Sequence, residues 1–287
     1  MTDGEHLADA ESANAGSTDA KSTDAGSTAD SVAADGAAHP LAHIPVAADT
    51  VGLLEGIAST RSIRRYRDEP VPEDVLRDIC FAASRAPTGS NRQPFRLIVL
   101  TDGPVAAEAK RLVADAAARL WRAKRHHDGY EAGSGSDDNS PKARMARSMD
   151  EHISGLATVP ALIFPVLLRH REPTETEGSS IYPAMQNLLL AARGRGYGGV
   201  VAMWHLPVEV DLRNLLQIPD DALLAATVTV GKPVGGHGPV RRRPLDHFVF
   251  DGRWGSTPAW AVDPPNTSHT SAGPPGTDRR NRSSADT

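Results

Sequence analysis

The chain has 287 residues, with 31 Lys and Arg against 36 Asp and Glu, a net charge of −5 and a single cysteine. One cysteine excludes an internal disulfide framework and favours a reduced, cytoplasmic setting. The acidic balance argues against nucleic acid as a partner of the whole chain. No apolar run approaches the roughly 18 residues that a membrane-spanning helix needs, so we expect no membrane segment.

The two ends of the chain differ in composition from the middle. Residues 1–50 hold nine acidic residues and one lysine, so the other 237 residues carry a charge of +3. This head has neither the basic nor the apolar region of a secretory signal, and it buries too little to fold, which predicts a disordered acidic head. The tail 264–287 is rich in Pro, Gly, Ser and Arg without apolar periodicity, so we also expect it to be disordered. The 213 residues 51–263 have the size of one domain.

Helices alternate with strands along that domain. The first strong helix begins after Pro72-Glu73, places Val75, Ile79 and Ala83 on one face and ends before Pro87. The predicted elements that follow are a strand over 95–100, helices over 105–125 and 142–153 joined by a polar loop over 128–141, a strand over 161–168, a helix over 181–193, and strands over 200–204 and 223–231. This order predicts an α/β or α+β layered fold.

Three polar segments suggest a ligand. In Arg61-Ser62-Ile63-Arg64-Arg65-Tyr66, arginines flank a hydroxyl, a combination suited to phosphate. In the turn Ala86–Phe95, Asn and Gln amides stand between two prolines, where they can read the donors and acceptors of a planar heterocycle. The third segment is the basic run Arg241-Arg242-Arg243. Each segment alone is also typical of an ordinary surface turn or solvated basic run.

In this order and spacing, the three segments resemble the nitroreductase family of FMN-dependent oxidoreductases. The resemblance runs from about Leu53 to Trp254 and includes Pro70–Leu76, the helix Gln186–Ala192 with its glycine-rich end, and the late strand with its basic run. Only the middle, roughly 105–155, matches no family pattern. The resemblance implies an α+β fold, nitroreductase-like, with a central mixed sheet flanked by helices.

The resemblance also implies roles for single residues. Arg61, Ser62 and Arg64 would bind the FMN phosphate and ribityl chain, with Arg241 and Arg243 closing on the same phosphate. The turn residues implied along the ribityl chain and the pyrimidine side of the flavin are Pro87, Thr88, Ser90, Asn91 and Gln93. The strand after Gly198-Gly199 would pass the ring, with Gly199 among the cofactor-binding residues and a backbone N–H near Met203 or Trp204 meeting flavin N5. Thr60 replaces a basic residue common in the family, and Arg65 is a substitute for its charge.

By the same resemblance, two chains form a homodimer and share each flavin site. NADH or NADPH would pass hydride to flavin N5, and a nitroaromatic, quinone or activated alkene would then take its place in the same cavity, giving ping-pong kinetics. This mechanism needs little from the protein's acids and bases, no side chain has to act as a nucleophile, and we assign no catalytic residue. Two alternatives stay open: an FMN-binding or storage protein without turnover, and an enzyme of the flavin-cleaving 5,6-dimethylbenzimidazole synthase branch. The middle region decides between enzyme and storage protein by covering the site or leaving it open.

Other signals favour structural roles. Gly194–Gly199 fits G-x-G-x-x-G, but a helix precedes it and a strand follows, so the glycines are better explained as a helix end. The histidine spacings do not predict a metal site. Cys80 lies on an apolar helix face, which favours a small core residue. His205, beside the strand 200–204, is a possible proton donor, although a structural role is the more common one.

Overall fold

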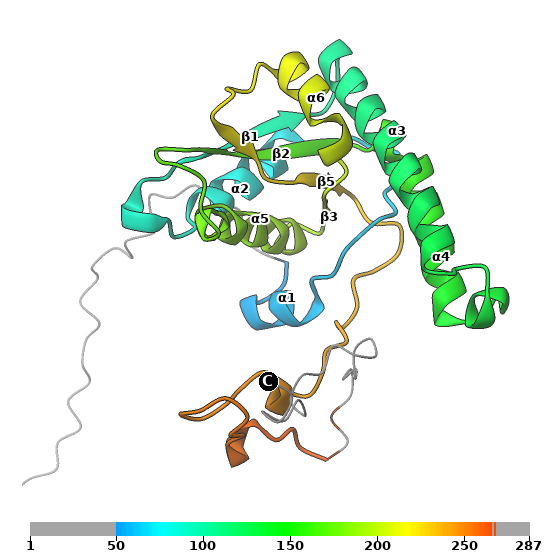
Figure 1. Ribbon diagram of the computed structural model, residues 1–287, viewed down its shortest axis with the longest axis vertical. Helices are drawn as coiled ribbons and strands as arrows, with labels where there is room; N and C mark the ends of the chain where they lie inside the picture. The colour runs from blue at the N-terminus through cyan, green and yellow to red at the C-terminus, as the bar shows by residue number, and fades with distance from the viewer. Residues whose placement is uncertain (1–49, 266, 268–287) are drawn as a thin grey trace, which may run out of the picture. The chain divides into compact units, whose positions relative to one another are not determined.

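The computed structural model describes residues 50–265 and 267. The predicted disordered head falls outside this range apart from residue 50, and the predicted tail falls outside it apart from residues 264, 265 and 267. Figure 1 labels the helices and strands within the range.

Six α-helices and five strands make up the described part of the chain. In chain order they are α1 (Leu53–Ser59), α2 (Glu73–Ser84), β1 (Phe95–Leu100), α3 (Pro104–His127), α4 (Pro141–Ser154), β2 (Ala161–Leu168), α5 (Tyr182–Gly194), β3 (Gly198–Ala202), α6 (Glu209–Leu216), β4 (Ala222–Leu224) and β5 (Thr227–Gly231). Local chemistry fixes several ends. Proline occupies the first turn of α3, α4 and α5, where its missing N–H costs nothing. The Ser140 hydroxyl also accepts the N–H of Ala143 and so caps α4.

The strands form one sheet in the order β1-β2-β5-β3, with β4 also paired to β2. Every strand pairing in the described part of the chain is antiparallel, whereas the sequence predicted a mixed sheet. The reason is the position of β5. The strands β2 and β3 run in the same direction and are connected through α5, but β5 lies between them and is antiparallel to both. The predicted α+β class itself is confirmed.

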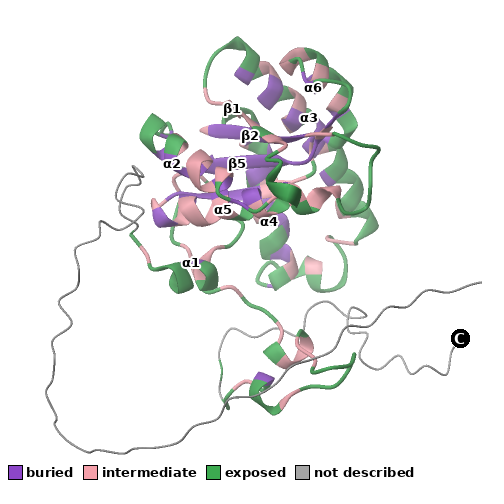
Figure 2. Ribbon diagram, turned by 90° about the vertical axis from the view of Figure 1, so that its left-hand side faces the viewer, coloured by how far each residue is buried: buried purple, intermediate pink, exposed green. Residues whose placement is uncertain are grey.

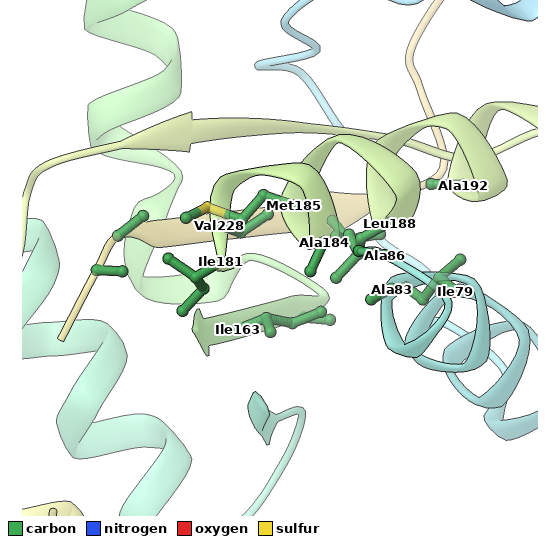
Figure 3. Packing of buried hydrophobic residues seen from close by; sticks show 14 of the residues in the cluster. Ile79, Ala83, Ala86, Ile163, Ile181, Ala184, Met185, Leu188, Ala192 and Val228 are labelled. Carbon is green, nitrogen blue, oxygen red and sulfur yellow. The ribbon is translucent and has the colours of Figure 1, made fainter. Parts of the chain in front are cut away.

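Helices cover both faces of this sheet. Alternate residues of β2 point to opposite faces: Ile163 packs with α2 and α5, and Phe164 packs with α3, α4 and α6. Figure 3 shows Ile163 and Val228 of the sheet together with the side chains of α5 and α2 that belong to the same buried cluster. Since both faces are covered, the central strands β2 and β5 lie in the buried interior, whereas the edge strand β1 is mostly half-buried (Figure 2). Fully buried side chains such as Leu188 of α5 each contribute about 1.5–3 kcal/mol of transfer free energy.

The predicted strand 223–231 is interrupted. In β2, Val166 pairs with Leu224 of β4 and Ile163 pairs with Val228 of β5, so three steps along β2 match four steps along the chain from β4 to β5. The extra residue between β4 and β5 is a β-bulge. The bulge lies opposite Pro165, which has no N–H to donate to a neighbouring strand. The short helices α1 and α6 were not predicted. The other predicted helices and strands are present, with ends that differ by about two residues at most.

The glycines after α5 act as a helix end, as predicted. Gly196 has a φ of +74°, and its N–H and that of Tyr197 bond back to carbonyls of the last turn of α5. Cys80 packs half-buried against the α2–α5 core, and burial raises the pKa of its thiol.

Candidate functional site

The arginine-rich segment 61–66 runs along the outer edge of β3. Ile63 donates its N–H to Gly199 at 2.9 Å, and Tyr66 forms a bridge with Pro233. The Tyr66 hydroxyl bonds to the Ile63 carbonyl at 2.6 Å and to the Thr229 hydroxyl at 2.7 Å. Burial raises the pKa of Tyr66, so its hydroxyl stays protonated. These bonds fix the backbone that carries Arg61, Ser62 and Arg64.

Of the two glycines at the start of β3, Gly198 makes this close approach possible. A Cβ at Gly198 would lie 2.5 Å from the Ile63 side chain, and a Cβ at Gly199 would lie 2.4 Å from the Thr229 carbonyl oxygen. A side chain at Gly198 would push the segment away from the sheet, whereas a side chain at Gly199 would press on β5. Gly198 therefore has a positioning role beneath the arginines, and Gly199 allows the close packing of β3 against β5. Its predicted contact with flavin stays a prediction.

The later basic run lies close to the same segment. Arg61 donates from Nη2 to the Gly236 carbonyl at 3.3 Å, and Val240, next to Arg241, donates its N–H to Ala58 at 3.0 Å. The structure thus brings the chain before Arg61 and the chain before Arg241 together, although they are about 180 residues apart in sequence. Arg61, Ser62 and Arg241 are exposed and Arg243 is half-buried. Cations and hydroxyls of this kind suit a phosphate.

Helix α4 supports Arg64 from the other side. His152 is 2% exposed, and its Nδ1 lies 3.2 Å from the Arg64 carbonyl oxygen, so it donates there as the Nδ1–H tautomer. Burial lowers the pKa of His152 to about 4, since a charged imidazole would lose its hydration. Burial also lowers the pKa of the Arg64 guanidinium. The middle region 105–155 therefore contacts the arginine segment through α4.

The amide-rich turn before β1 has an unusual backbone. Ser90, Asn91 and Gln93 all have φ near +51°, a conformation that costs a non-glycine residue about 1–3 kcal/mol. Hydrogen bonds hold it: Gln93 donates its N–H to the Thr88 hydroxyl at 3.0 Å and its side-chain amide to Asn91 Oδ1 at 3.2 Å. Strain of this kind gathers at ligand sites. Pro87, Asn91 and Gln93 are exposed and so can meet a ligand.

One chain does not bring the arginine segment and the turn together. The segment lies beside β3, at the end where β5 pairs with the start of β2. The turn leads into β1 at Phe95, which pairs with Leu167 at the other end of β2. They occupy diagonally opposite corners of the sheet, and three strand spacings alone separate the edges by roughly 14 Å.

Three further predicted residues have clear positions. Arg65 Nε lies 3.0 Å from Glu151 Oε2 of α4, so its charge is already paired and it is a poor substitute for the residue that Thr60 replaces. His205 is 1% exposed with Nδ1 3.3 Å from the Thr227 hydroxyl, which makes it structural. Met203, just after β3, is 42% exposed, so a ligand can approach the chain there.

The sequence did not single out His152 or His237 for the site. His237 lies near Arg61 and Arg193, and its Nε2 is 3.0 Å from the Tyr197 carbonyl oxygen. Burial, with a smaller effect of the two arginines, lowers the pKa of His237. The only sequence signal was its place in the glycine-rich turn 235–238 before the basic run.

Comparison with known proteins gives consistent matches. The sequence model of the nitroreductase family matches residues 57–232. A protein of Thermus thermophilus named NADH dehydrogenase is 31% identical over 194 residues, which is 66% of this chain and 91% of that protein. A 4-nitrobenzoate reductase of a Nocardioides species is 25% identical over 242 residues, covering 74% of this chain and 93% of that protein.

A solved structure has the same fold. The crystal structure of a putative nitroreductase in complex with FMN, from Desulfovibrio desulfuricans, superimposes with a TM-score of 0.51 at 25% identity, covering 71% of this chain and 98% of that one. Within residues 50–265, none of the helices combines the length and apolar composition needed to cross a membrane.

Proposed function

Since this chain belongs to the nitroreductase family and is an oxidoreductase, we propose that FMN is its cofactor and NADH or NADPH its reductant. The proposed acceptor is a nitroaromatic, a quinone or an activated alkene. The observation that supports this best is the arginine segment 61–64, anchored to β3 and lying close to the chain that leads into Arg241. Of the described residues, these offer the donor set that a flavin phosphate needs.

In this proposal Arg61, Ser62, Arg64, Arg241 and Arg243 hold the phosphate and ribityl chain of FMN. Bound FMN would supply the hydride acceptor and donor that the side chains lack. The turn residues Pro87, Thr88, Ser90, Asn91 and Gln93 would bind the ribityl chain and the pyrimidine side of the flavin. Their hydrogen bonds and the nearby positive charge would stabilise added negative charge there, because preorganised dipoles need no rearrangement during the reaction.

The reductant and the acceptor would occupy one cavity in turn, which predicts ping-pong kinetics. A backbone N–H near Met203 or Trp204 is the candidate contact at the reacting edge of the ring. The buried position of His205 leaves protons for the reduced acceptor to come from solvent.

We further propose a homodimer with two shared sites. The arginine segment and the amide turn lie at opposite corners of the sheet, so a second copy is needed to supply one to the other. Large apolar side chains also stay exposed in one chain: Leu53 and Leu54 of α1 at 70% and 80%, and Trp254 and Trp260 at 81% and 72%. Exposed apolar surface of this kind is typical of an interface between subunits.

The phosphate assignment is tested by the double variant Arg61→Ala, Arg243→Ala. Each arginine removed eliminates a charge-assisted bond of about 1.5–3 kcal/mol, so the variant should purify with little FMN and bind added FMN at least 100-fold more weakly. The measurement is flavin absorbance per chain, with circular dichroism to check folding. Arg119→Ala, an exposed arginine of α3, is the control and should keep its flavin. A double variant with full flavin would place the phosphate elsewhere.

Turnover separates an enzyme from a storage protein. If the wild-type protein is an enzyme, NADH or NADPH added without air should bleach its flavin absorbance, and a nitroaromatic should restore it. A flavin that stays oxidised under both reductants would favour the storage alternative.

A further inference from the structure

A cavity of about 220 Å³ lies beside the amide turn, between it and residues 167–180. Its apolar lining comes from Pro94, Leu167 and Leu168, where β1 and β2 end. The Leu168 N–H donates to the Pro94 carbonyl at 2.8 Å, which joins the two strand ends. The Ser180 hydroxyl accepts the N–H of Gly89 at 3.2 Å, which ties the turn to the segment across the cavity.

One wall of the cavity is an ordered ion pair. Arg169 donates from Nε and Nη2 to the two carboxylate oxygens of Glu177, both at 2.8 Å, and both side chains are about one-fifth exposed. The pair raises the pKa of Arg169 and lowers that of Glu177, so both stay charged. Its charges cancel and it serves as a rigid wall.

The charge that remains in the lining is mainly positive. Arg92 of the turn and Arg171 after β2 both line the cavity, and neither guanidinium bonds to another residue that the structure describes. Glu172 is the one carboxylate of the described lining that lies outside the ion pair. A lining that combines these two guanidiniums with apolar side chains suits a ligand with a flat apolar part and an anionic oxygen group.

The volume limits the size of that ligand. A protein cavity of about 150 Å³ holds benzene, so 220 Å³ accommodates one aromatic ring with a charged substituent. Because Ser90 lines this cavity and also belongs to the turn that we assign to FMN, a ligand here would lie close to the flavin.

We propose that this cavity is the acceptor subsite and that it selects aromatic carboxylates. The ring would pack on Pro94 and Leu167, and the carboxylate would bind Arg92 and Arg171. The assignment rests on the proposed function, because it takes the amide turn as the flavin contact. The other anion that such arginines can bind is a phosphate of the nicotinamide reductant.

The test compares 4-nitrobenzoate with nitrobenzene as acceptors of the holoenzyme. In the wild type, kcat/KM should be at least tenfold higher for the carboxylate. In the double variant Arg92→Gln, Arg171→Gln this preference should fall by about tenfold or more, since both charge-assisted contacts are lost. The matched control Arg119→Gln removes an exposed arginine of α3 and should keep the wild-type preference.

A binding measurement gives a readout apart from turnover. Calorimetric titration with benzoate, and with benzamide as its uncharged counterpart, should show benzoate binding that the double variant weakens about tenfold. An equal loss of kcat/KM with 4-nitrobenzoate and with nitrobenzene in the double variant would overturn the subsite. A benzoate affinity that is equal in the wild type and the variant would overturn it too. A rise in KM for NADPH but not NADH, with the 4-nitrobenzoate preference intact, would assign the arginines to the reductant's phosphate and also overturn it. A chain that lacks flavin but binds benzoate through these arginines would reject the proposed function and support the subsite.

Discussion

His152 is a neutral imidazole held inside the fold, and its titration opposes folding in acid. Its pKa is about 4 in the folded chain against about 6.5 for an ordinary histidine. Between these pH values the unfolded chain binds more protons, so the free energy of unfolding falls as the pH is lowered from 6.5 to 4. At about 1.36 kcal/mol per pKa unit, the loss is about 3 kcal/mol.

The variant His152→Asn keeps a donor for the Arg64 carbonyl but cannot titrate. We expect its urea unfolding free energy, measured at several pH values, to fall less steeply below pH 6.5 than that of the wild type. His127→Asn, at the exposed end of α3, is the control and should follow the wild-type curve. Parallel curves for His152→Asn and the wild type would show that another group causes the loss of unfolding free energy below pH 6.5.

The sequence could not single out His152, because its role depends on a contact between residues 88 positions apart. The arginines and amides were identified because three short segments, in their order and spacing, resemble a known family, although each segment alone is also typical of an ordinary turn or basic run. A histidine that supports a carbonyl has no local signature.

At the level of elements, prediction succeeded where the pattern is local and failed where it depends on neighbours. The helix α2 and the strand β1 follow from apolar periodicity and flanking prolines. The bulge between β4 and β5 depends on Pro165 in another strand, and the insertion of β5 between β2 and β3 depends on pairing across the whole sheet. Neither feature can be predicted from a single segment of the sequence.

Packing of segment 61–66 on β3 can be tested at Gly198, with Gly56 as the control. In Gly198→Ala the new Cβ would lie 2.5 Å from the Ile63 side chain, so we expect a loss of about 1–3 kcal/mol in unfolding free energy and weaker FMN retention as the arginines shift. Gly56→Ala, in α1 with no atom within 4 Å of the new Cβ, should instead stabilise by about 0.4–1 kcal/mol. The measurements are thermal unfolding and flavin content. A Gly198→Ala protein with wild-type stability and flavin would show that the close approach is dispensable.

At the level of the whole molecule, the arginine segment and the amide turn lie at opposite corners of the sheet, so one chain cannot hold a flavin with both. This separation predicts that two chains share each site. If each flavin is held by the arginine segment of one chain and the amide turn of the other, damage to either half in every chain should abolish both sites. We therefore expect Arg61→Ala with Arg243→Ala, and separately Asn91→Ala with Gln93→Ala, to leave homodimers with little flavin.

Mixed dimers of these two variants then decide between shared and private sites. In a heterodimer, one site combines the intact arginines of one chain with the intact turn of the other, and the second site has both halves damaged. Shared sites thus predict one flavin per heterodimer. Private sites would each contain a damaged half, so the heterodimer would hold none. Co-expression with two different affinity tags, sequential purification and flavin absorbance per chain measure the difference, and a flavin-free heterodimer that elutes as a folded dimer would refute the shared site.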